Sequence, residues 1–98
     1  MCSIIAYEGR DISLQELDMA FSRSYMRGPD ARCIQTLAGG YIGFNRLAIM
    51  GLSSLGMQPF SLKGNQVVCN GEIFGFRLIR RQLIEQGYEF RSNSDCEV

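Results

Sequence analysis

The chain has 98 residues, a usual length for one domain, and leucine, isoleucine, valine and phenylalanine make up 27 of them, enough to bury a hydrophobic core. Its ten basic and ten acidic side chains cancel, so no overall field attracts nucleic acid or an anionic membrane surface, and we expect neither partner. No run approaches the roughly 18 apolar residues of a membrane span, and no export signal precedes the first strand, so we expect a cytoplasmic protein with reduced thiols.

The beginning of the chain predicts a strand, a helix and a turn. Residues 3–7 form a short, continuous apolar run that is typical of a buried strand. Ser13 and Glu16 have the spacing of a capping box, and the apolar residues that follow at intervals of three and four predict a helix over residues 14–25. The Arg-Gly-Pro-Asp run at 27–30 then predicts a rigid turn, because proline disfavours helical geometry before it and has no N–H.

The middle of the chain predicts two β-hairpins. The glycine-containing run 38–40 separates the two strands of the first hairpin, and a turn centred on Gly64 separates those of the second. A Gly- and Ser-rich loop over residues 50–58 connects the hairpins. The four expected strands cover residues 33–37, 41–49, 60–62 and 66–70.

The last third of the chain predicts one helix and the start of another. Residues 74–86 have a helical apolar pattern that ends at Gly87, and Glu85 is spaced to pair with Arg81 one turn earlier. The polar run 92–95 is typical of a helix start. Since the sequence stops three residues later, we expect this chain to be part of a longer protein.

Cys2 is the first candidate for a catalytic residue. Because a small residue follows Met1, removal of the methionine would leave a thiol and an α-amine on one residue. An α-amine has a pKa of roughly 7.7 to 8.0, so it can act as a base near neutral pH. The chain has no histidine, so an activated cysteine needs another base. The alternative is that Cys2 is an incidental terminal residue.

The other cysteines do not suggest a metal site. Cys33, Cys69 and Cys96 are widely spaced, form no C-x-x-C pair and have no histidine to complete a zinc site. We therefore expect no bound metal.

Asn70 and Gly71 are candidates for stabilising negative charge on an oxygen. An asparagine amide and a glycine backbone N–H are two donors of the kind that an acyl-transfer intermediate requires. The same dipeptide is also a common turn sequence. Its significance therefore depends on the residues around it.

Three charged residues complete the candidate site. Arg46 lies in an apolar predicted strand, and its planar guanidinium suits a carboxylate. Glu72 and Asp95 are candidates for an ammonium group, although each also has a plain structural role at a helix start, and Arg46 could lie at a rim. Together with Cys2, Asn70 and Gly71, these residues predict a site for an amino acid with a side-chain amide, which is glutamine.

The chain resembles the N-terminal glutaminase domain of class II glutamine amidotransferases, and within that class the glutamine-hydrolysing asparagine synthetases. The resemblance extends over the whole chain. It rests on ordered motifs: Met-Cys-Ser-Ile at 1–4, Arg-Gly-Pro-Asp at 27–30, Arg-Leu-Ala-Ile at 46–49, Met-Gln-Pro at 57–59, Asn-Gly-Glu-Ile-Phe at 70–74, Phe-Arg-Ser at 90–92 and Ser-Asp-Cys-Glu-Val at 94–98.

The resemblance implies an α+β, N-terminal nucleophile fold in which two antiparallel sheets stack between helices, of which residues 1–98 form only the first half. It implies that Cys2 attacks the glutamine amide, with Asn70 and Gly71 as the oxyanion hole. Arg46 is then the α-carboxylate clamp, and Glu72 and Asp95 bind the α-ammonium group. Ammonia would pass to a synthetase domain or a partner chain, where ATP and magnesium are expected; this chain itself needs no cofactor. Association into a homo-oligomer is a further expectation.

Several positions depart from the family pattern. Met26 and Asn45 stand where the family has histidine, Gly51 stands at a commonly acidic position, and Gly75 replaces a common asparagine, whereas Ser3 is compatible with the family. We expect these changes to remove polar groups around the site. Two functions therefore stay open: a glutamine-hydrolysing part of an asparagine synthetase, and a non-catalytic remnant or interaction module of the same fold.

Overall fold

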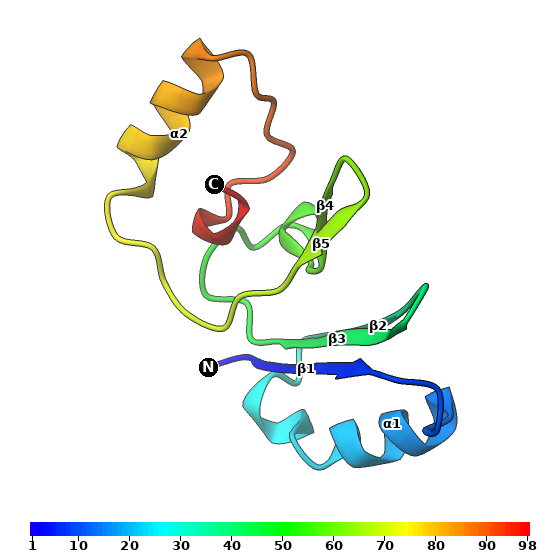
Figure 1. Ribbon diagram of the computed structural model, residues 1–98. Helices are drawn as coiled ribbons and strands as arrows, with labels where there is room; N and C mark the ends of the chain where they lie inside the picture. The colour runs from blue at the N-terminus through cyan, green and yellow to red at the C-terminus, as the bar shows by residue number, and fades with distance from the viewer.

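The computed structural model describes all 98 residues and contains two α-helices and five strands (Figure 1). The chain is of the α+β class, as expected, and its strands pair only in antiparallel fashion. The elements are β1 (Ser3–Glu8), α1 (Leu14–Ser22), β2 (Ala31–Leu37), β3 (Gly40–Arg46), β4 (Phe60–Leu62), β5 (Asn65–Val67) and α2 (Phe76–Glu85).

The larger sheet has three strands in the order β1-β3-β2, with β3 at its centre. Helix α1 covers one face of this sheet (Figure 1). The helix buries Leu17 and Phe21, and a Cβ at Gly43 of β3 would lie 3.0 Å from the Phe21 ring. The missing side chain at Gly43 therefore lets the helix pack closely on the central strand.

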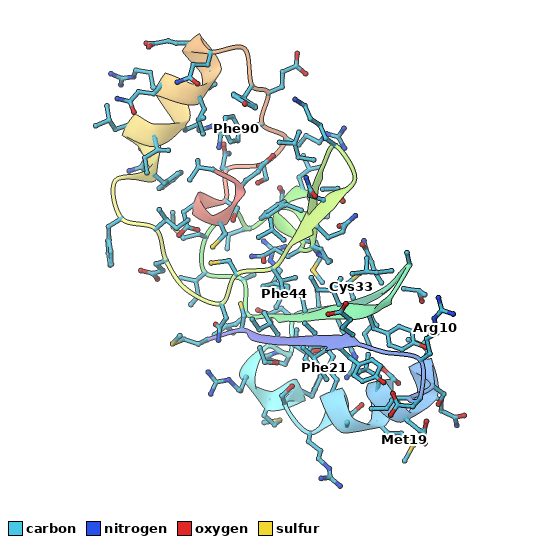
Figure 2. All side chains as sticks on the ribbon, viewed as in Figure 1. Arg10, Met19, Phe21, Cys33, Phe44 and Phe90 are labelled. Atoms are coloured by element: carbon cyan, nitrogen blue, oxygen red, sulfur yellow. The ribbon has the colours of Figure 1, made fainter.

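The opposite face of the sheet carries the rest of the core. Side chains alternate along a strand, so Phe44 points away from Phe21, as Figure 2 shows. Phe44 is 1% exposed and its neighbour on this face, Ile42, is also buried. The β4–β5 hairpin lies on this side of the sheet, and α2 lies farthest from α1 (Figure 1). Both faces of β3 thus carry buried side chains, with α1 on one side and the β4–β5 hairpin on the other.

Two strands end earlier than the sequence pattern predicts, because side chains take the backbone groups that would continue them. β3 ends at Arg46, not at residue 49, since the Leu47 N–H donates to Cys2 Sγ and the Ala48 N–H donates to Asp30 Oδ2. β5 ends at Val67, not at residue 70, and the Cys69 N–H donates to a glutamine side chain. Both early endings create the irregular backbone that surrounds the candidate site.

Other expected boundaries and contacts also need correction. α1 ends at Ser22, three residues early, because the Ser24 hydroxyl caps the Phe21 carbonyl at 2.8 Å and a 3-10 turn follows. β1 is half-exposed rather than buried, with Ile4 on an open face of an edge strand. The polar run at 92–95 leads into a 3-10 turn, Asp95–Glu97. Arg81 makes no ion pair with Glu85; the one ion pair joins Arg32 to Asp18.

Helix α2 has no buried residue, so its stability comes from few packing contacts. Of its expected apolar face, Phe76 and Leu83 are half-buried, while Ile79 is 39% exposed. The Arg80 guanidinium lies 4.7 Å from the Phe90 ring centre, near the segment that returns from the helix (Figure 2). At nine and ten residues, neither α-helix is long enough to cross a bilayer.

We expect the amide protons of α2 to exchange with solvent much faster than those of β3. Local opening costs little where few apolar groups are buried, whereas the central strand opens only with the sheet. Native-state hydrogen exchange measured by NMR will give the two opening free energies. Comparable protection of α2 and β3 would contradict this expectation.

Candidate active site

The pairing of β1 with β3 places Cys2 at the candidate site. Ser3, the first residue of β1, pairs with Asn45, so Cys2 lies just before β1 begins and beside the end of β3. Its Sγ accepts a hydrogen bond from the Leu47 N–H at 3.2 Å and lies 3.5 Å from the Leu47 carbonyl oxygen. The thiol is therefore held against the backbone at the end of β3.

The Arg-Gly-Pro-Asp turn holds this strand end from the other side. Arg27 Nε donates to the Cys2 carbonyl at 3.3 Å, and the Asp30 N–H donates to the Arg46 carbonyl at 2.9 Å. Gly28 packs so closely that a Cβ there would lie 2.3 Å from the backbone oxygen of Asn45. The turn thus positions the residues on either side of the thiol by backbone contact.

Arg46 is the last residue of β3 and is buried, with 6% of its surface exposed. Its guanidinium donates to the backbone carbonyls of Ser53 at 2.9 Å, Met50 at 3.5 Å and Gly51. Arginine has five N–H donors, so two remain after these three hydrogen bonds. Arg46 therefore holds the loop after β3, a role that its residue type and position in the sequence do not indicate, and two of its donors make no hydrogen bond within the protein.

Gln58 holds the irregular segment after β5 that leads to Asn70 and Gly71. This buried amide donates from Nε2 to the Cys69 carbonyl at 3.2 Å and accepts the Cys69 N–H at Oε1, at 2.6 Å. The Asn70 side chain and the Gly71 N–H have no hydrogen-bond partner in the protein, so both donors are free. In the sequence Gln58 stands out only as part of the Met-Gln-Pro motif, and its spacing does not indicate the pairing with Cys69.

Asp95 reaches the site from the C-terminal 3-10 turn. It is 5% exposed, and its Oδ2 accepts the Ile73 N–H at 2.7 Å, which ties the turn to the segment after Gly71. Glu97 closes the turn by accepting the Arg91 and Ser92 N–H groups at 2.7 and 2.8 Å. Burial acts to raise the pKa of Glu97, but these hydrogen bonds, with that of the Ser92 hydroxyl, hold it below its usual value.

All six residues predicted for the site line one cavity of about 340 Å³, a size suited to a small ligand. Its wall carries one cation, from Arg46, and two acidic side chains, from Glu72 and Asp95. The Cys2 thiol and the two free donors line the same cavity. No three cysteine or acidic side chains come together as a metal site would require. The six residues are Cys2, Arg46, Asn70, Gly71, Glu72 and Asp95.

Comparison with known proteins decides the family. The family model described as a glutamine amidotransferase domain matches residues 1–98. The chain belongs to this family. An Acanthamoeba polyphaga mimivirus protein named probable asparagine synthetase [glutamine-hydrolyzing] is 36% identical over 100% of this chain and 19% of its own length. A Dictyostelium discoideum protein of the same name is 32% identical over 99% of this chain and 18% of its own.

Other relatives of the amidotransferase domain have different names. The Penicillium rubens protein named amidase chyE is 39% identical over 87% of this chain and 13% of its own length. The chain thus spans about a fifth or less of the length of these relatives. No solved structure matches it significantly.

In this amidotransferase domain, the structure accounts for two of the departures from the family pattern, at Asn45 and Gly51. Asn45 is fully buried, and its Nδ2 donates to the hydroxyls of Ser3 and Ser24 at 3.0 and 3.1 Å, so polarity is kept there. Its Oδ1 has no partner. Gly51 has φ of +57° and packs against the backbone of Ser94, which a side chain would disturb. The expected loss of a polar group is therefore wrong at Asn45. Met26 is 85% exposed, so its side chain faces solvent.

Proposed function

We propose that the chain is the N-terminal part of a glutamine-hydrolysing module with the N-terminal nucleophile fold, in which Cys2 releases ammonia from glutamine. The observation that carries the proposal is the single cavity that Cys2 shares with two free oxyanion donors and three charged residues. Helix α1, the three-stranded sheet and the β4–β5 hairpin follow one another in space, an order that agrees with the first layers of that fold.

In the proposed reaction, Met1 is removed and the α-amine of Cys2 acts as the base. Met1 itself lines the cavity, so its removal leaves that amine at the cavity wall. The thiol transfers its proton to the amine while Sγ bonds to the amide carbon of glutamine, and the amine then protonates the departing ammonia. Water hydrolyses the resulting thioester to glutamate and regenerates the thiol.

The free donors of Asn70 and Gly71 stabilise the negative oxygen of the two tetrahedral intermediates. Such donors contribute most when they are held in place before the reaction, and Gln58 holds the residue that precedes them. Removal of a single oxyanion donor typically costs about 3 to 4 kcal/mol of transition-state stabilisation. Asn70 and Gly71 are therefore proposed as catalytic residues together with Cys2.

The charged residues select a free amino acid. Arg46 binds the α-carboxylate with its two remaining donors, and Glu72 with Asp95 binds the α-ammonium group. A zwitterion satisfies both signs of charge in the cavity, whereas a simple amide satisfies neither. Glutamine fits this pattern, because its side chain also carries the amide that Cys2 attacks.

Asparagine is the proposed final product, with aspartate as the ammonia acceptor, since several relatives are named asparagine synthetases. Synthesis would require ATP and magnesium in another domain or partner chain. The residues of this chain do not fit that pair: the sequence has no Gly-rich phosphate loop, and no acidic cluster forms. Relatives named amidases also contain a stretch similar to this chain, so similar sequences occur in proteins with another name.

The test uses 6-diazo-5-oxo-L-norleucine, a reactive analogue of glutamine that keeps its charged groups. We expect this analogue to modify Cys2 before the other three cysteines, in a chain that has lost Met1. Peptide mapping by mass spectrometry will locate the label, and glutamate release will measure hydrolysis. Cys33→Ser, in β2 and outside the cavity lining, is the matched control and should react like the chain without a substitution.

Two outcomes would contradict the proposal. Preferential labelling of Cys33, Cys69 or Cys96 would remove Cys2 from the mechanism, and so would retention of Met1 in the purified protein. Selective labelling of Cys2 without any release of glutamate would instead favour the second candidate, a non-catalytic module that keeps the glutamine-binding geometry.

A further inference from the structure

Two thiols meet at one wall of the cavity, and the proposed reaction uses neither. Both Cys69 and Cys96 line the cavity, and both are free. Cys96 Sγ donates to the Gly71 carbonyl at 3.5 Å, and a Cβ at Gly71 would lie 4.0 Å from Cys69 Sγ. Gly71 therefore has one of the two sulfurs on its carbonyl side and the other on its Cα side.

The two cysteines belong to segments that are anchored independently. Gln58 holds the backbone of Cys69 with two hydrogen bonds. Ser94 Oγ accepts the Cys96 N–H at 3.3 Å at the start of the C-terminal turn. Between them the chain passes through α2, which buries none of its residues. The two cysteines are thus each held in place, although the chain that connects them is long and packs weakly.

The environment of Cys96 agrees with this proximity. Burial, the neighbouring Cys69 thiol and the negative charge of Asp95 together raise the pKa of Cys96. Cys69 is half-buried, whereas Cys96 is 7% exposed. Cys69 is therefore the sulfur that an external reagent reaches first.

We propose that Cys69 and Cys96 form a reversible disulfide by exchange with a small-molecule disulfide, and that this bond ties the Asn70–Gly71 segment to the C-terminal turn. Cys69 Sγ attacks one sulfur of the reagent, forms a mixed disulfide and releases one thiol. Cys96 then gives its proton to a base in the solvent, and its thiolate attacks Cys69 Sγ and releases the second thiol. The two protons of the cysteines leave on the two released thiols, so two cysteines and one disulfide give one bridge and two small thiols.

The bridge would act on the cavity whose ligand is proposed above. The bridge closes the loop that contains α2 and joins Cys69, which precedes Asn70 and Gly71, to Cys96 in the C-terminal turn. Detachment of this turn from the cavity wall therefore becomes less favourable. The disulfide itself does not depend on the reaction of Cys2. Failure of one proposal can thus be told apart from failure of the other.

The experiment incubates the 98-residue chain at pH 8 with oxidised glutathione and maps disulfides in a non-reducing digest. We expect the Cys69–Cys96 bridge to exceed every other pairing of the four cysteines by roughly tenfold, because the folded chain holds both sulfurs beside Gly71. Reduced glutathione should reverse it. In urea this preference should fall toward the share of Cys2–Cys33 and Cys33–Cys69, which are separated by similar lengths of chain.

Cys33→Ser is the control and should keep the bridge, while Cys69→Ser and Cys96→Ser should each lose it. The bridged chain should unfold at a higher urea concentration than the reduced chain. A dominant Cys2–Cys69 bridge, or separate glutathione adducts on Cys69 and Cys96 without a bridge, would overturn the proposal. A bridge that leaves the unfolding midpoint unchanged would overturn its role in tying the cavity wall.

Discussion

Replacing Gly28 with alanine is expected to destabilise the chain by about 3 kcal/mol or more, because the new methyl group meets backbone that cannot move aside. A Cβ at this position would lie 2.3 Å from the Asn45 oxygen and 2.8 Å from the Arg46 carbonyl carbon. Both atoms belong to the central strand of the sheet. The added carbon therefore forces the turn away from β3, against the closest packing in this part of the fold.

The movement should also disturb the candidate site. The same turn carries Arg27, whose guanidinium holds the Cys2 carbonyl, and Asp30, whose carboxylate holds the Ala48 N–H. Any chain that still folds should therefore react more slowly at Cys2 with the glutamine analogue. Folding loss and reactivity loss are expected to appear together, since one backbone contact supports both.

The measurement is urea unfolding followed by far-UV circular dichroism. Gly39→Ala is the matched control, because a Cβ at Gly39 would have no neighbour within 4 Å, and we expect it to change stability by less than about 1 kcal/mol. Equal unfolding midpoints for Gly28→Ala and the unmodified chain would show that the turn can shift freely, contrary to this argument.

Local patterns were sufficient to predict most elements of the fold. The Ser13–Glu16 capping box forms as expected and starts α1, with the Ser13 hydroxyl accepting the Glu16 N–H and the Glu16 carboxylate accepting the Ser13 N–H. The strand ends were harder to predict. β3 ends because Cys2 and Asp30, which are distant in sequence, take its next two N–H groups. No pattern within the strand itself carries that information.

The candidate site shows the same division. Residue types alone suggested a thiol, two donors and three charges that would suit glutamine, and the resemblance to a family implied the same roles. That all six line one cavity depends on the β1–β3 register and on the contact of Asp95 with the Ile73 N–H. Gln58 forms hydrogen bonds with the backbone of Cys69, and the Cys69 and Cys96 side chains lie close together. Neither pair has a sequence spacing that belongs to a helix or a strand pattern. Such pairings follow from tertiary packing and could not be predicted from spacing.

Replacing Arg46 with lysine is expected to lower the preference of Cys2 for the glutamine analogue over iodoacetamide by roughly ten- to a hundredfold. Iodoacetamide carries neither the carboxylate nor the ammonium group, so the ratio of the two rates reports recognition of the amino acid rather than thiol reactivity. Hydrogen bonds to charged groups contribute about 1.5 to 3 kcal/mol, and a tenfold change corresponds to about 1.4 kcal/mol.

The chemistry of the two side chains explains the size of this effect. The Arg46 guanidinium uses three hydrogen bonds to hold the carbonyls of the loop after β3 and keeps two donors for the substrate. Lysine has three donors on one nitrogen and no planar fork, so it cannot serve the loop and a carboxylate at once. The charge remains, and attraction to the carboxylate is weakened rather than abolished.

Arg46→Met separates support of the loop from recognition of the substrate. Methionine has a similar length but leaves the backbone carbonyls of Ser53, Met50 and Gly51 without their donor, and each such loss costs roughly 1 to 3 kcal/mol when the group stays buried. We therefore expect Arg46→Met to lower the urea midpoint strongly and to slow both reagents. Arg46→Lys should lose mainly selectivity. If the lysine variant instead slowed both reagents equally, Arg46 would have only the structural role, and the α-carboxylate of glutamine would need another partner in the cavity.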